Sequence, residues 1–199
     1  MNGRGIFTGN LVCALDAQLF KAKKVFDGKM ADEAVESTTI GGIDRDDVVG
    51  AGIAVVIVNV FGAVPAILGG PSTDWFESVA KPSLFPPTWT FGVVWTILFT
   101  MMGVATYVVY SRGSDRQEVK VALGLFVVQM AFNVAWTPTF FAFQSIGLAF
   151  GIILGLFISV MLTTWAFARV DRRAAALLVP YIVWVGFAAI LNYQFLQLN

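Results

Sequence analysis

Long apolar runs, each about the length of a membrane-spanning helix, follow one another along most of the chain. A hydrocarbon core about 30 Å thick needs about 20 apolar residues in helical form. Five segments meet this requirement, at about 48–70, 90–110, 119–141, 146–168 and 174–198. Backbone in lipid must satisfy its own hydrogen bonds, and the strands of a barrel would alternate over only about 10 residues. We therefore predict an all-α membrane protein, a bundle of five transmembrane helices.

Prolines and glycines interrupt the apolar segments at defined places. Pro65 and Pro138 are expected to kink or end their helices, and Pro180 is expected within the first two turns of the last one. Gly147, Gly151 and Gly155 form a GxxxGxxxG pattern on one helical face. This pattern favours close helix packing, either within the bundle or across a dimer.

The connection between the first two segments is unusual for a loop. The stretch from Lys81 to Trp95, KPSLFPPTWTFGVVW, contains three prolines, two tryptophans and two phenylalanines. Proline restricts φ, so a proline-rich loop has few conformations to lose on ordering. We predict a structured first loop, a preformed lid that continues into the second helix.

Residues 1–46 differ in character from residues 47–199, which form the predicted membrane domain. Four of the six lysines precede Met30, and acidic residues are frequent from Ala31 to Asp47. Two interpretations stay open: a mobile leader, with Met30 as an alternative start, or a helix lying on an anionic membrane surface. The second rests on apolar residues that share one helical face, namely Leu11, Leu15, Leu19, Ala22 and Phe26.

Basic residues in the short loops predict the orientation of the bundle. Two loops on the side of the N-terminus carry six of them: Arg112, Arg116, Lys120, Arg169, Arg172 and Arg173. The opposite side offers only Lys81. Because basic loops stay cytoplasmic, we predict a multi-pass protein of the cell membrane with its N-terminus in the cytoplasm. In a eukaryote the same asymmetry would apply to an organelle membrane.

Composition agrees with this class and excludes several kinds of chemistry. The 199 residues are 57% hydrophobic and 13% charged, against about 25% charged in soluble domains, and the mean hydropathy is +0.76. The 13 basic and 13 acidic residues cancel, so no global charge attracts nucleic acid. The chain has no histidine and one cysteine, which excludes the usual metal and haem ligands. We expect no metal and no required cofactor.

Polar side chains inside the predicted spans are costly and therefore informative. Gln129 and Asn133 lie four residues apart on the third helix, on a face that continues with Trp136. On the fifth helix Tyr181 shares a face with Trp184, Ala188 and Leu191. Asn192 lies beside that face. Such amides hold helices together or line a cavity, and both roles can coexist.

The six tryptophans divide into two groups. Trp75, Trp89 and Trp165 suit the membrane interface, where tryptophan normally collects. Trp184 lies about 15 Å inside the fifth helix, from the helical rise, which is too deep for an interfacial belt. We expect Trp184 to face the bundle with Trp95 and Trp136 as neighbours. An aromatic-walled pocket of this kind suits a flat, apolar ligand with polar edges.

Three motifs in this order resemble the translocator protein family, also called tryptophan-rich sensory protein (TspO) or peripheral benzodiazepine receptor. The first is the Lys81–Trp95 stretch, preceded by the pair Trp75-Phe76. The second is Gln129–Phe141, QMAFNVAWTPTFF. The third comprises Pro180–Trp184 and Leu191–Tyr193 in the last helix. The resemblance covers about residues 50–199.

The resemblance implies a five-helix bundle, often a homodimer, with a pocket capped by the first loop. The implied ligands are protoporphyrin IX and related tetrapyrroles, sterols and synthetic drugs, with membrane lipid as the surroundings. Carried over by motif position, the ligand-binding residues are Phe91, Gly92, Trp95, Asn133, Trp136, Leu148, Gly151, Trp184, Ala188 and Leu191. In some bacterial members the tryptophans that match Trp95 and Trp184 are implicated in light-dependent porphyrin breakdown.

Some positions depart from the family pattern. Leu84 replaces a tryptophan of the first loop, Val93 replaces a proline, and Leu148 stands where mammalian members have tryptophan. The sterol motif of mammalian members needs a basic residue after Tyr193, and residues 194–199 contain none. High-affinity cholesterol binding is therefore not expected.

These observations lead to three functional hypotheses. The first is a membrane protein that binds porphyrins, acting as sensor, scavenger or carrier. Without histidine a haem would lack its usual axial ligand, so metal-free protoporphyrin IX is favoured. The second is a light- and oxygen-dependent porphyrin-degrading enzyme that uses Trp95 and Trp184. The third is a transporter of tetrapyrroles or lipids, although five spans show no internal repeat.

Overall fold

The computed structural model describes residues 21, 23–24, 39–40, 43–69 and 73–199. The chain divides into two compact units, Met1–Val48 and Val49–Asn199. In the first unit β1 (Thr39–Ile40) and β2 (Ile43–Asp44) pair antiparallel, with Thr39 opposite Asp44. The apolar face predicted between residues 11 and 26, and the predicted mobility of the leader, fall on residues outside those described.

Five helices of the described residues are long and apolar enough to cross a membrane, which confirms the predicted fold class. They are α2 (Arg45–Gly69), α4 (Thr88–Tyr110), α5 (Gln117–Phe141), α6 (Ile146–Val170) and α7 (Arg172–Leu198). Their ends lie within about three residues of the sequence-based estimates. The start of α7 has a clear physical cause, because Asp171 Oδ1 accepts a hydrogen bond from the backbone N–H of Arg173 at 2.7 Å.

The three prolines act differently from one another. α2 continues beyond Pro65 to Gly69, so this proline does not end its helix. Pro138 precedes the end of α5 by three residues, and its carbonyl accepts hydrogen bonds from the N–H groups of Ala142 and Phe143. Pro180 is the ninth residue of α7 counted from Arg172, and thus lies in the third turn. It comes later than predicted because Asp171 starts the helix two residues earlier than the apolar run.

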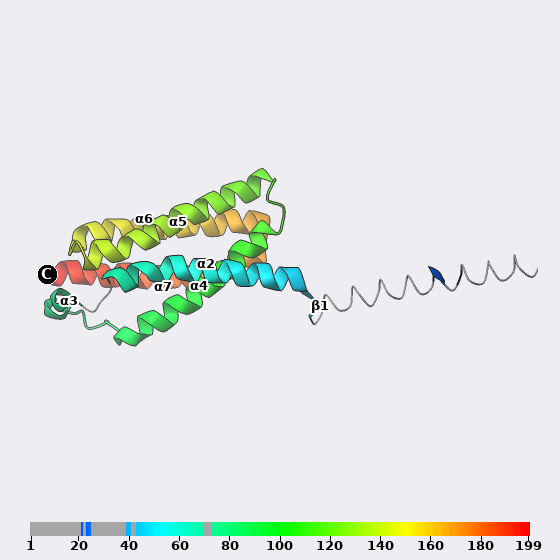
Figure 1. Ribbon diagram of the computed structural model, residues 1–199. Coiled ribbons are helices and arrows are strands. Elements are labelled where there is room, and N and C mark those ends of the chain that lie inside the picture. The colour runs from blue at the N-terminus through cyan, green and yellow to red at the C-terminus, as the bar shows by residue number, and fades with distance from the viewer. Residues whose placement is uncertain (1–20, 22, 25–38, 41–42, 70–72) are drawn as a thin grey trace, which may run out of the picture. The chain divides into compact units, whose positions relative to one another are not determined.

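Helix α6 lies between α5 and α7, and α4 packs mainly against α7 (Figure 1). Large side chains are fully buried in this core, among them Met102, Phe167 and Leu178. Gly155 of α6 belongs to the packing with α5, because a Cβ there would lie 2.9 Å from the ring of Phe132. The glycine pattern of α6 therefore contributes at least one close contact within the bundle.

Helix α2 is held against α4 at a few points. A Cβ on Gly103 of α4 would lie 2.5 Å from Cα of Val55, so the two backbones approach closely there. Four residues further along α2, the Asn59 Nδ2 donates to Thr100 Oγ1 at 3.3 Å. Only 11% of the apolar stretch of α2 is buried, against 28–33% in the other four spans. α2 is thus a sparsely packed wall of the bundle.

The first loop is ordered by a short helix, α3 (Asp74–Ser78). Thr73 Oγ1 caps this helix by accepting from Phe76 N–H at 3.3 Å, and Lys81 Nζ donates to the carbonyl of Phe76 at 3.0 Å. Phe76 is buried and meets the ring of Phe141 edge-on at 5.1 Å. The predicted structured first loop is confirmed, and it packs through aromatic rings onto the end of α5.

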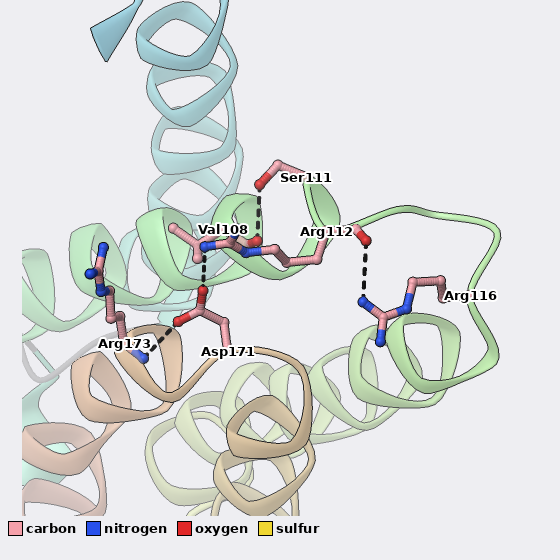
Figure 2. A network of polar contacts seen from close by, with 6 residues as sticks. All are labelled: Val108, Ser111, Arg112, Arg116, Asp171 and Arg173. Carbon is pink, nitrogen blue, oxygen red and sulfur yellow. Dashed lines mark hydrogen bonds and ion pairs between the residues drawn. The ribbon is translucent and has the colours of Figure 1, made fainter. Parts of the chain in front are cut away.

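At the opposite end of the bundle an ion pair joins two turns (Figure 2). The Arg112 Nη2 after α4 lies 2.5 Å from Asp171 Oδ2 in the turn between α6 and α7. The hydrogen bond from Arg173 N–H is the main cause that lowers the pKa of Asp171 from its usual 3.8. Desolvation raises this pKa by less, and the hydrogen bond and positive charge of Arg112 lower it further. The carboxylate thus couples the start of α7 to the end of α4.

Candidate functional site

A chain of buried hydrogen bonds links α5 to α7 near the middle of the bundle. Asn133 Nδ2 donates to the hydroxyl of Tyr181 at 2.8 Å, and that hydroxyl donates to Gln129 Oε1 at 2.9 Å. The Nε2 of Gln129 lies 3.9 Å from the sulfur of Met102 on α4. The amides predicted from their four-residue spacing therefore hold the helices together, and they also orient Asn133.

A second polar link lies closer to the first loop. Trp136 Nε1 donates to Asn192 Oδ1 at 3.0 Å, and Asn192 Nδ2 donates to the backbone carbonyl of Ile146 at 3.1 Å. The indole of Trp136 also stacks on Phe140, with ring centroids 5.2 Å apart. Three helices, α5, α6 and α7, therefore hold this tryptophan in one orientation.

Between these links and α2 lies a cavity of about 420 Å³, roofed by the first loop. This volume is within the range of about 300–1,000 Å³ that is usual for small-molecule sites. Eleven of its described lining residues are aromatic: Phe76, Phe85, Trp89, Phe91, Trp95, Phe99, Trp136, Phe140, Phe141, Trp184 and Phe195. The walls are therefore flat and polarizable, and suited to a planar apolar molecule.

The polar groups of the cavity carry no formal charge. Among the described residues the lining includes Asn59, Asn133, Asn192 and three threonines, and it includes no acidic or basic side chain. A charged group bound deep in the cavity would lack a counter-ion and would have to shed water. The cavity thus favours a neutral ring, with any ligand carboxylates kept towards its opening.

The structure brings together eight of the ten residues that were predicted to bind ligand. Those that line the cavity are Phe91, Gly92, Trp95, Asn133, Trp136, Trp184, Ala188 and Leu191. Leu148 and Gly151 do not line it. Leu148 is 59% exposed, and a Cβ on Gly151 would meet nothing within 4 Å. The face of α6 that turns inward carries Ile153 and Leu156 instead.

Trp184 borders two cavities at once. A second cavity of about 500 Å³ lies between α4 and α7, and the described residues that line it are all apolar: Val94, Ile97, Leu98, Met101, Pro180, Val183, Trp184 and Phe187. The indole packs against Phe91 on the side of the first cavity and Phe187 on the side of the second, at 5.9 and 5.4 Å. Its Nε1 is buried and has no hydrogen-bond partner among the described residues. The indole ring of Trp184 therefore lies between the two cavities, and its N–H group is available to a ligand acceptor.

Trp95 packs against the apolar core and contacts two other aromatic rings. It stacks on Phe99 at 5.2 Å and meets Tyr181 edge-on at 6.0 Å. Trp89 and Trp165 are exposed, as expected for interfacial residues, whereas Trp75 packs edge-on against Phe140. The predicted inward group of tryptophans, Trp95, Trp136 and Trp184, lines one cavity.

Several lining residues were not among the predicted ligand contacts. Phe76 and Phe85 enter from the first loop, and Asn59 and Ala63 come from α2. The aromatic character of the loop was a signal for the first two. Leu84, which replaces the tryptophan of the family pattern, is 55% exposed and does not line the cavity. The contact of the first loop with the cavity is therefore carried by phenylalanine.

Comparison with known proteins agrees with this architecture. Residues 54–198 match the model of the TspO/MBR family. The chain is 45% identical to the tryptophan-rich protein TspO of Chlorobaculum tepidum over 65% of this chain and 82% of that protein. It is 33% identical to a tryptophan-rich sensory protein of Cereibacter sphaeroides over 67% and 87% of the two chains. It is 37% identical to the translocator protein of Ovis aries over 65% and 78%. The family match covers all five spans apart from the first turns of α2, and the chain belongs to the TspO/MBR family.

Proposed function

We propose that this multi-pass membrane protein binds a tetrapyrrole, protoporphyrin IX or a close relative, in the cavity beneath the first loop, and acts as a sensor, scavenger or carrier. The observation that carries the proposal is the cavity itself, which combines aromatic walls with uncharged polar groups. A planar macrocycle offers large faces for such walls, and aromatic contacts contribute about 0.5–1.5 kcal/mol each beyond area burial.

Two free polar groups favour a ligand with both acceptors and donors at its core. Trp184 Nε1 is a buried donor that has no partner among the described residues, and burying such a group costs free energy until an acceptor reaches it. Asn133 uses its Nδ2 on Tyr181, which leaves its Oδ1 as the acceptor at the cavity wall. A metal-free porphyrin carries N–H donors and imine nitrogen acceptors, and it needs no axial ligand from a chain without histidine.

The test is titration of protoporphyrin IX into the purified protein, followed by tryptophan quenching and by the shift of the porphyrin absorption band. We expect saturable binding, weakened at least tenfold in Trp95→Phe/Trp184→Phe. Trp165→Phe is the matched control, since Trp165 is exposed and stacks under Arg169 outside the cavity. Unsaturable quenching, or equal affinity in the double variant, would refute the assignment.

A second candidate function is light-dependent oxidative degradation of the bound porphyrin. The observation that favours it is that Trp95 and Trp184 border the same cavity, so two oxidisable indoles would flank a bound, light-absorbing ligand. Illumination of the complex in air should then convert the porphyrin to a new absorbing product in the wild type and not in the double variant. Loss of porphyrin at the same rate in a solution of free tryptophan would count against catalysis.

The charge asymmetry supports a topology in which the turns after α4 and α6 face the cytoplasm, together with the N-terminus. The first loop would then face the opposite compartment. Accessibility of single cysteines to a membrane-impermeant reagent tests this in intact cells. Ser78→Cys in the first loop should react, whereas Ser111→Cys after α4 should not.

A further inference from the structure

The two turns at the end of the bundle opposite the first loop form a strongly basic surface. Its six basic side chains are all exposed: Arg112, Arg116, Lys120, Arg169, Arg172 and Arg173. The same two turns hold three acidic residues, Asp115, Glu118 and Asp171. Six basic and three acidic side chains give the surface a formal net charge of +3. The turns at the other end carry Asp74, Glu77 and Lys81.

The basic side chains differ in how far their charge is already neutralised. Arg112 is paired with Asp171, and Arg116 Nη2 lies 2.7 Å from Glu118 Oε2. Arg172 and Arg173, by contrast, have no ion pair among the described residues, although Arg173 adjoins Asp171 through its backbone N–H. Figure 2 shows the side chain of Arg173 leading away from the Asp171 carboxylate, which accepts the hydrogen bond of the Arg173 N–H. Two guanidinium groups at the start of α7 are thus left without a counter-ion.

The position of this surface identifies the kind of counter-ion it meets. It stands at the ends of α4, α5, α6 and α7, where membrane spans leave the hydrocarbon core. One turn before the end of α6, Trp165 is 57% exposed and lies under the guanidinium of Arg169, 4.8 Å from its ring centroid. Tryptophan collects at headgroup level, so this pair places the arginines of the α6–α7 turn among lipid phosphates.

We propose that the α6–α7 turn is a binding surface for anionic phospholipid headgroups, with Arg172 and Arg173 as the residues that select them. A guanidinium presents a planar fork of N–H donors that matches two phosphate oxygens. Asp171 does not oppose this, because its charge is satisfied by Arg112 and by the N–H of Arg173. The ion pair also fixes the turn, so little conformational entropy is lost when a headgroup binds.

The experiment measures the preference of the full-length protein for phosphatidylglycerol over phosphatidylcholine, using spin-labelled lipids of both kinds in reconstituted vesicles. A basic residue near an anionic surface contributes about 1 kcal/mol, which corresponds to about fivefold in affinity. We expect a clear preference in the wild type and its loss in Arg172→Gln/Arg173→Gln. Because the attraction is electrostatic, salt at about 1 M, where the Debye length falls to about 3 Å, should weaken it.

Two further variants separate the proposal from simpler explanations. Arg116→Gln/Glu118→Gln removes two exposed charges from the same end without changing net charge, and should retain the preference. Arg172→Lys/Arg173→Lys keeps both positive charges but not the planar fork of donors, and should retain only part of the preference. Circular dichroism in phosphatidylcholine alone verifies that each variant is folded. The proposal is overturned by a wild type without preference, by an undiminished preference in the double glutamine variant, or by equal loss in the charge-neutral control.

Inorganic phosphate distinguishes a lipid surface from a site for free anions. We expect that phosphate at the same ionic strength as sodium chloride reduces the lipid preference no more than the chloride does. A selective, saturable competition by phosphate would overturn the assignment to lipid headgroups.

Discussion

The two sides of the central cavity are built in different ways. On one side α5, α6 and α7 are closely packed and joined by the hydrogen bonds of Tyr181 and Trp136. On the other side α2 meets α4 at close approaches that include Gly103 against Val55, and at a polar link from Asn59, while most of its apolar surface is exposed. One wall therefore defines the shape of the site, and the other is the part that can move at low cost.

Gly103→Leu should break this arrangement most severely. A Cβ alone would lie 2.5 Å from Cα of Val55, so the leucine must push α2 away from α4. Overpacking of this kind costs about 1–3 kcal/mol and occasionally more. We expect a lower melting temperature in detergent and at least a tenfold loss of porphyrin affinity. Gly124→Leu is the control, because no atom lies within 4 Å of a Cβ there. Equal effects in both variants would show that the α2–α4 contact is not special.

Tyr181→Phe tests the closely packed wall. The change leaves Asn133 Nδ2 and Gln129 Oε1 without their shared partner. A buried polar group left without its hydrogen bond costs about 1–3 kcal/mol of stability in soluble proteins. A hydrogen bond between membrane helices contributes about 0.6 kcal/mol on average. We expect about 1–2 kcal/mol lower stability, measured by reversible unfolding in mixed micelles, with a weaker effect on affinity than Gly103→Leu. Tyr193→Phe, on an exposed side chain outside the cavity, should change neither.

Changes at Asp171 test whether a loss of stability far from the cavity alters ligand affinity. Asp171 caps α7 and does not line the cavity. Its pKa is lower in the folded protein than the usual 3.8, so its stabilisation is present above about pH 4 and is lost as pH falls through the folded value. Asp171→Ala removes both the cap and the ion pair and should cost about 1 kcal/mol. Asp171→Asn keeps a capping oxygen and should cost less.

The stability difference between the wild type and Asp171→Asn should be constant from pH 6 to 8 and shrink below about pH 4. A difference that grows in acid would reverse the sign assigned to this carboxylate. Porphyrin affinity at pH 7 should be the same in all three proteins.

Thr100→Val should have the smallest effect and the most specific one. It removes the acceptor of Asn59 Nδ2, the polar link between α2 and α4. We expect at most about 0.6 kcal/mol, near the bilayer average for one hydrogen bond, and about a twofold change in porphyrin affinity. Thr106→Val is the matched control, because among the described residues the Thr106 hydroxyl bonds within its own helix, at the Met102 carbonyl. An equal change in both would assign the effect to helix α4 alone.

The spans and the first loop could be predicted because lipid imposes length, apolarity and backbone pairing on the sequence. The inward position of Asn133 could be predicted because an amide facing hydrocarbon is costly. The rotation of α6 could not. Leu148 faces outward and Leu156 inward, yet lipid and protein core accept leucine equally well. Hydropathy therefore does not distinguish the inward face of α6 from the outward face. The prediction that Leu148 and Gly151 bind ligand came from the family motif alone.

The contribution of α2 to the cavity was hidden for a related reason. Ala63 and Gly62 line the cavity through their small size, not through polarity or aromaticity. Small residues are frequent throughout membrane helices, so they mark close approach without naming the partner. Only the position of α2 against α4 shows which of them border the cavity.

The ion pair between Arg112 and Asp171 has a consequence for biosynthesis. The two residues are 59 positions apart, and α5 and α6 are made between them. The two side chains lie on the same face of the bilayer only when α5 and α6 cross it as a pair. A nascent chain that fails to insert one of them would leave the arginine and the aspartate separated by hydrocarbon. The ion pair is therefore incompatible with a topology in which only one of the two helices has crossed.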